Sequence, residues 1–141
     1  MEVTSATEAY QPTAAEEPEK AEPQHWGYHL VLDCRACDIP AITNPKVLDT
    51  FLRTLVKEID MKMYGEPVMA HFATHDPKAS GYTLMQMIET SSITGHFVDL
   101  NGDAYIDVFS CKPFETATAV KVVNEFFHPQ NIKLTMLYRQ A

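Results

Sequence analysis

The period of the hydrophobic pattern changes twice along the chain, and this feature constrains the fold more than any other. Between residues 47 and 63, apolar side chains recur every three or four residues, which indicates a helix with one buried face. Asn44 is the predicted N-cap and Pro45 lies in the first turn, while Gly65 is expected to end the helix. Residues 114–127 repeat the helical period, so we expect two amphipathic helices.

The segments around these helices have the composition and alternation of strands. They are residues 26–33, 67–74, 82–89, 93–98, 104–110 and 132–138. The Asn101-Gly102 pair between two of them is a hairpin signal, which favours antiparallel pairing. The predicted fold is therefore α+β, a two-layer sandwich of a mainly antiparallel sheet with two helices on one face.

The first 24 residues differ in composition from the rest of the chain. They contain six glutamates against one base, Lys20, together with three prolines and no apolar periodicity. Such a segment buries too little apolar surface to offset the entropy of ordering. We expect residues 1–24 to be a disordered acidic tail and residues 25–141 to form one domain.

Charge and cysteine content narrow the classes of partner. The chain has 11 basic and 19 acidic residues, a formal net charge of -8, which opposes binding to nucleic acid. No apolar run approaches the roughly 20 residues that span a bilayer, so no membrane partner is expected. Cys34 and Cys37 have zinc-like spacing but no second pair follows, so we expect no metal and reduced thiols in the cytoplasm.

Candidate chemistry is concentrated between residues 88 and 111. Ser91 is a weak nucleophile unless another group removes its proton, and His96 and Cys111 are the nearby proton carriers. Residue types alone leave a structural explanation open, because serine and histidine are common in strands and cysteine is often a small buried apolar residue.

Residues 26–139 resemble the prokaryotic, small-chain S-adenosylmethionine decarboxylase proenzyme family. In that family a serine becomes a pyruvoyl group, a histidine follows five residues later, and a cysteine follows twenty residues after the serine. Ser91, His96 and Cys111 keep both intervals, and Asp107-Val108-Phe109-Ser110-Cys111 reproduces the cysteine strand. The stretches HLVLDC and GYTLMQMIE are also similar to the family's.

Two segments depart from the family pattern. Thr90-Ser91-Ser92-Ile93 stands where the family has Glu-Ser-His-Ile around the cut. Phe97-Val98-Asp99-Leu100 stands where the family has Trp-Pro-Glu after the histidine, so the carboxylate expected to hold a ribose hydroxyl has moved or is missing. Asp99 and Asp103 are the candidate substrate-binding replacements.

The resemblance implies self-cleavage between Thr90 and Ser91 into a β chain, residues 1–90, and an α chain, residues 91–141. Ser91 would become the covalent pyruvoyl cofactor, which binds the substrate amine as a Schiff base. The implied reaction converts S-adenosylmethionine to carbon dioxide and decarboxylated S-adenosylmethionine, the aminopropyl donor of spermidine biosynthesis. The family's habit also implies a homodimer of cleaved αβ protomers, with the active site shared across the interface.

The resemblance also assigns roles to three further side chains. His96 would transfer protons and assist processing, Cys111 would donate a proton to the substrate carbon, and the Thr83 hydroxyl would aid processing. Strand alternation places Ser91 and His96 on opposite faces, so a joint role within one chain needs a β-bulge, for which Gly95 is the candidate, or release of Ser91 by cleavage. Two alternatives stay open: an ornithine or arginine decarboxylase of the same mechanism, and an unprocessed S-adenosylmethionine-binding module.

Overall fold

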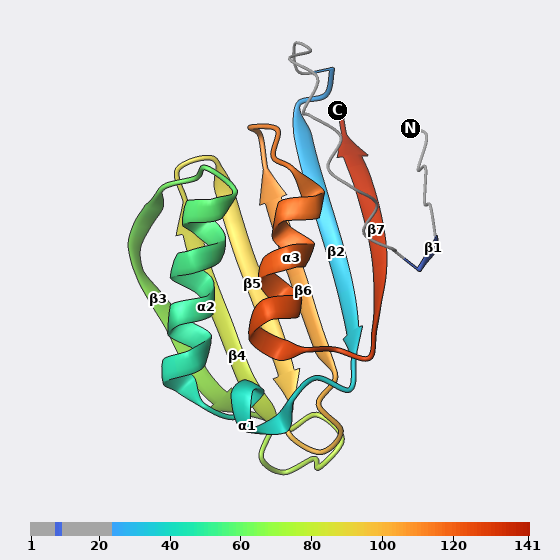
Figure 1. Ribbon diagram of the computed structural model, residues 1–141. Helices are drawn as coiled ribbons and strands as arrows, with labels where there is room; N and C mark the ends of the chain where they lie inside the picture. Colours follow the sequence, from blue (N-terminus) through green and yellow to red (C-terminus); the bar gives the residue numbers. More distant parts are fainter. Residues whose placement is uncertain (1–7, 10–23) are drawn as a thin grey trace.

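The described residues form an antiparallel sheet with its two long helices on one face (Figure 1). The computed structural model describes residues 8–9 and 24–141. The strands are β1 (Glu8–Ala9), β2 (Gly27–Arg35), β3 (Met63–Phe72), β4 (Gly81–Ile88), β5 (Ser91–Val98), β6 (Ala104–Ser110) and β7 (Asn131–Arg139). The helices are α1 (Ile39–Ile42), α2 (Pro45–Glu58) and α3 (Thr116–Phe127). The strand order is β1-β7-β2-β6-β5-β4-β3, and the predicted α+β sandwich is confirmed.

Most of the predicted acidic tail lies outside the described residues. Its two described residues in strand β1 pair with β7, where Glu8 is opposite Leu134 and Ala9 is opposite Lys133. The expected disorder of residues 1–24 therefore stays a prediction. None of the helices in the described part of the chain is long and apolar enough to cross a membrane.

Helix α2 begins as predicted but ends earlier than expected. Asn44 Oδ1 accepts a hydrogen bond from the Lys46 backbone N–H at 3.0 Å, and Pro45 is the first helical residue. The helix ends at Glu58 because Asp60 adopts a left-handed conformation with φ of 58°. The Met61 N–H then bonds to the Val56 carbonyl at 2.9 Å, which completes a Schellman-type cap.

Gly65 is therefore a strand residue, and the prediction that it ends the helix is wrong. It lies in β3 with φ of 72°, inside an irregular stretch where the pairing with β4 shifts between Tyr64 and Val68. The buried Gln86 side chain donates to the Tyr64 and Gly65 carbonyls at 3.2 and 3.1 Å, which satisfies backbone groups that the irregular ladder leaves free.

The remaining predicted strands and the second helix agree with the structure to within a few residues. Strand β6 has the predicted bounds, and the Asn101-Gly102 signal marks the turn of the antiparallel β5–β6 hairpin. The one-turn helix α1 was not predicted, because its four residues are too few to show a helical period.

The sheet has one covered face and one open face. Leu32, Ile93, Phe97 and Ile106 are almost fully buried beneath α2 and α3, which themselves meet through Phe51 and Phe127 with ring centroids 4.5 Å apart. No described helix covers the other face. The large apolar side chains exposed on that face include Val68, Phe72, Met85, Met87 and Tyr105. We call this the open face.

The two left-handed glycines allow a matched test of the packing around the β5–β6 turn. An alanine Cβ at Gly65 would meet nothing within 4 Å, whereas one at Gly102 would lie 2.4 Å from the Cys37 carbonyl oxygen. Gly65→Ala should cost about 1 kcal/mol of unfolding free energy from the backbone alone. Gly102→Ala should cost about 1–3 kcal/mol more, because the turn must also shift. Urea unfolding at one protein concentration measures both, and equal losses would contradict the packing.

Candidate active site

The β5–β6 pairing brings the predicted cleavage site beside Cys111. Ser91 is the first residue of β5 and lies opposite Ser110, the last residue of β6. The Cys111 backbone N–H consequently donates to the Thr90 carbonyl oxygen at 3.0 Å. This carbonyl belongs to the peptide bond predicted to be cut, so an N–H donor already contacts the oxygen on which negative charge would develop. We call Thr90, Ser91 and Cys111 the cleavage half-site.

Two side chains that sequence reasoning missed lie against Thr90. The fully buried Ser110 Oγ donates to Thr90 Oγ1 at 2.8 Å, and Thr90 Oγ1 lies 3.2 Å from the Met61 Sδ atom. Strand alternation indicates that Ser110 points inward. Met61, however, comes from the segment after α2 and carries no sequence signal of this contact.

His96 forms a second group with Thr83, in the adjacent strand. Thr83 and His96 face each other across β4 and β5, and Thr83 Oγ1 lies 2.6 Å from His96 Nδ1. His96 Nε2 lies 2.8 Å from the Ala79 carbonyl, which only accepts, so Nε2 carries a hydrogen. In the neutral ring Nδ1 then accepts the Thr83 hydroxyl. We call Thr83 and His96 the histidine half-site.

The two half-sites are well separated within one chain. Five residues of extended strand span about 16 Å, and alternation puts Ser91 and His96 on opposite faces. The pairing of β5 with both neighbours is continuous from Ser91 to Phe97, so the expected bulge at Gly95 is absent from these ladders. Gly95 instead leaves room for the Phe97 ring, which would lie 2.9 Å from an added Cβ.

The predicted substrate-binding carboxylates follow β5 at the end nearer to His96. Asp99 Oδ2 lies 2.6 Å from His71 Nε2, while its Oδ1 is buried without a hydrogen-bond partner. Asp103 Oδ1 accepts the Ala36 backbone N–H at 3.0 Å. Asp103 therefore supports the turn, whereas Asp99 retains a buried acceptor oxygen that no other described residue bonds to.

Comparison with known proteins identifies the family. The family model for S-adenosylmethionine decarboxylase matches residues 28–140. The chain belongs to the S-adenosylmethionine decarboxylase family. Proteins named S-adenosylmethionine decarboxylase proenzyme from Clostridium botulinum strains Langeland and Hall are each 28% identical over 100 residues, covering 70% of this chain and 81% of theirs. The sequence-based assignment to the prokaryotic proenzyme family is thus confirmed.

A solved structure supports the fold of this decarboxylase-family chain. The crystal structure of the adenosylmethionine decarboxylase from Aquifex aeolicus VF5 superposes with a TM-score of 0.69 at 19% identity. The match covers 84% of this chain and 94% of that one, so the sheet and its helices correspond over nearly the whole relative.

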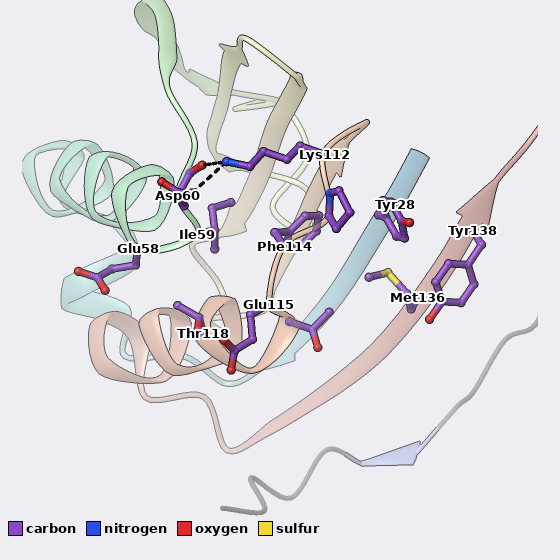
Figure 2. A pocket seen from close by; sticks show the side chains of 12 residues that line it. Tyr28, Glu58, Ile59, Asp60, Lys112, Phe114, Glu115, Thr118, Met136 and Tyr138 are labelled. Carbon is purple, nitrogen blue, oxygen red and sulfur yellow. Dashed lines mark hydrogen bonds and ion pairs between the residues drawn. The ribbon is translucent and has the colours of Figure 1, made fainter. Parts of the chain in front are cut away.

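A cavity of about 550 Å³ lies on the helix side of the decarboxylase fold (Figure 2). Tyr28, Phe114 and Tyr138 contribute aromatic walls, and Lys112 Nζ donates to the Asp60 carboxylate at 3.0 Å. Neither half-site contributes a lining residue to this cavity. The cavity is therefore distinct from both half-sites.

The three thiols differ sharply in environment. Cys34 and Cys37 are buried, and the hydrogen bond with Cys37, together with burial, raises the pKa of the Cys34 thiol. Cys111 is exposed. Among the described residues, no group of three or more histidine, cysteine, aspartate or glutamate side chains is placed to hold a metal ion.

These environments predict selective alkylation. Iodoacetamide added to the folded protein should modify Cys111 first, whereas Cys34 and Cys37 should react only after denaturation, because the thiolate is the nucleophile and burial excludes the reagent. Peptide mass spectrometry at timed intervals measures the three rates. Modification of Cys34 as fast as Cys111 in folded protein would contradict the assignment.

Proposed function

We propose that this decarboxylase-family chain is a self-processing proenzyme that is cut between Thr90 and Ser91. The cut forms a pyruvoyl group from Ser91, and the processed enzyme decarboxylates S-adenosylmethionine. The observation that carries the proposal is the 3.0 Å hydrogen bond from the Cys111 N–H to the Thr90 carbonyl, together with the position of Ser91 next to that carbonyl. A nucleophile, an electrophile and a charge-stabilising donor are thereby held in one place.

The first step of processing is an acyl shift. Ser91 Oγ attacks the Thr90 carbonyl carbon, and the developing oxyanion is stabilised by the Cys111 N–H. The bond between the Thr90 carbonyl carbon and the Ser91 nitrogen then breaks. The nitrogen takes up the hydroxyl proton, and an ester joins Thr90 to the Ser91 side chain.

The second step is an elimination that releases the two chains. A base removes the Ser91 α-proton, and the Cβ–O bond breaks with its electron pair leaving on the Thr90 carboxylate. Water then replaces the amino group of the resulting dehydroalanine, ammonia leaves, and a ketone remains. Residues 1–90 become the β chain and residues 91–141 the pyruvoyl-capped α chain.

A second copy of the chain supplies the base in this proposal. His96 is about 16 Å along the strand from Ser91, so it cannot reach the α-proton of its own chain. The open face exposes Val68, Met85 and Met87, and an uncovered apolar surface of this kind marks an interaction site. A twofold contact across this face exchanges the ends of β5, which brings the partner's histidine half-site to the end of the strand where Ser91 lies. Ser91 itself starts on the covered face, and the acyl shift, which breaks its peptide bond to Thr90, releases its backbone so that the α-proton can turn toward the partner.

The same residues serve the decarboxylation. The pyruvoyl group supplies an electron sink for the electron pair released with carbon dioxide. The exposed Cys111 thiol then returns a proton to the substrate α-carbon, and the partly exposed Asp99 carboxylate of the partner subunit accepts a substrate hydroxyl. The product is decarboxylated S-adenosylmethionine, the aminopropyl donor of spermidine biosynthesis.

The first test is the intact mass of the purified protein under denaturing conditions. Two fragments should appear whose masses sum to that of the chain plus one water minus one ammonia, with the cut after Thr90. Ser91→Ala should remain uncleaved yet folded, because the nucleophile is gone. Ser92→Ala is the matched control and should be cut normally.

Other outcomes of this experiment overturn the proposal. A wild-type chain that stays whole after long incubation indicates an unprocessed binding module. Cleavage that persists in Ser91→Ala and stops in Ser92→Ala moves the cut by one residue. Release of carbon dioxide from ornithine or arginine, but not from carboxyl-labelled S-adenosylmethionine, would assign a different substrate.

The shared site is tested by mixing two inactive variants. Ser91→Ala keeps His96, and His96→Ala keeps Ser91, so a heterodimer contains one site with both groups and one with neither. Coexpression should restore cleavage of the His96→Ala chain and part of the decarboxylase activity, while each variant alone shows little of either. If both groups act within one chain, the mixture will be as inactive as the separate variants.

A further inference from the structure

A series of hydrogen bonds runs through the side chain of Thr90, the residue before the cut. The Lys112 backbone N–H donates to Ser110 Oγ at 3.0 Å, and Ser110 Oγ donates to Thr90 Oγ1 at 2.8 Å. Thr90 Oγ1 in turn points to the Met61 sulfur at 3.2 Å. The Ser110 hydroxyl also lies 3.8 Å from the Met61 sulfur, but its contact with Thr90 is much the shorter, so the hydrogen bond of the series runs from Ser110 to Thr90.

This series is separate from the bond that polarises the carbonyl. Ser110 holds the side chain of Thr90, while the neighbouring Cys111 holds its carbonyl oxygen at 3.0 Å. The backbone of Ser110 also lies opposite Ser91 in the ladder. Ser110 and Cys111, two consecutive residues at the end of β6, therefore hold the side chain and the carbonyl of Thr90, and Ser110 also pairs with Ser91 in the ladder.

The contacts to the side chain and to the carbonyl oxygen of Thr90 restrict rotation of the peptide group that follows its Cα. The orientation of that group decides whether its carbonyl carbon faces the Ser91 hydroxyl, and small errors in such an alignment reduce rates strongly. Because Ser110 is fully buried, its bond to Thr90 does not compete with bulk water.

We propose that Ser110 is a positioning residue for self-cleavage, acting through the Thr90 hydroxyl. The inference rests on the proposed self-processing and adds to it a group that does not touch the reacting atoms. It assigns Ser110 to the first step, the acyl shift, because the geometry it controls is that of the Thr90 carbonyl. Once the ester exists, elimination depends on the base at the Ser91 α-carbon instead.

The test is the rate of fragment formation in freshly purified Ser110→Ala and Thr90→Val. Each should be cut about tenfold more slowly than the wild type, the factor that one positioning hydrogen bond supplies. The double variant should be no slower than the slower single variant, because both changes break one interaction. Ser110→Thr, which keeps a hydroxyl at the same position, should retain most of the wild-type rate. Thr50→Val removes a comparable hydroxyl bond to Lys46 O, 2.9 Å long and far from the cut, and should leave the rate unchanged.

Hydroxylamine separates a positioning role from a merely structural one. It cleaves esters, so it should accelerate fragment formation where the ester accumulates, as expected for His96→Ala, and do little for Ser110→Ala.

Wild-type rates in both Ser110→Ala and Thr90→Val, or strong acceleration of Ser110→Ala by hydroxylamine, would overturn the inference. Failure of the wild type to cleave would instead refute the proposed function. If Ser110→Ala fails to fold, Thr90→Val decides the question, because valine keeps the shape of a partly exposed threonine.

Discussion

The register of the β5–β6 hairpin is the constraint on which the rest of the arrangement depends. It sets Ser91 opposite Ser110, and this alone brings the Cys111 N–H to the Thr90 carbonyl. A slip of one residue would turn every side chain of the strand to the other face. The buried Ile93, which lies opposite the buried Val108, opposes such a slip of β5, because its side chain would leave the core. Core packing and the geometry of the cut are therefore secured by the same ladder.

One face of the sheet forms the hydrophobic core, and the other is the proposed contact surface for a second copy of the chain. The covered face buries Phe97 and Ile106 under the helices, whereas the open face presents methionines and valine without a described cover. The two half-sites lie at opposite ends of β5, so a regular strand keeps them apart in one chain. A bulge would bring them closer at the cost of the ladder. A twofold partner joins them while leaving every strand intact, which is the physical argument for the proposed dimer.

The sequence predicted the elements well wherever periodicity or turn chemistry was strong. Strand β6 and the start of α2 were correct because alternation and the Asn44 cap are local signals. The end of α2 was wrong because Asp60, and not a glycine, takes the left-handed position. For the site, the intervals among Ser91, His96 and Cys111 came from a family resemblance. The bonds of Ser110 and Met61 to Thr90 join segments distant in the chain, so no local pattern predicts them.

These tertiary contacts also account for the departure from the family at residue 90. The Thr90 hydroxyl sits between a fully buried serine and a thioether sulfur, a setting that satisfies one donor and one acceptor. A glutamate there would bring a charge beside a sulfur that solvates it poorly, and it would need a different set of neighbours. The backbone bond from Cys111 to the Thr90 carbonyl, by contrast, does not involve the side chain of residue 90. The side chain before the cut can thus change together with the residues that pack on it, while the main-chain geometry on which cleavage depends is retained.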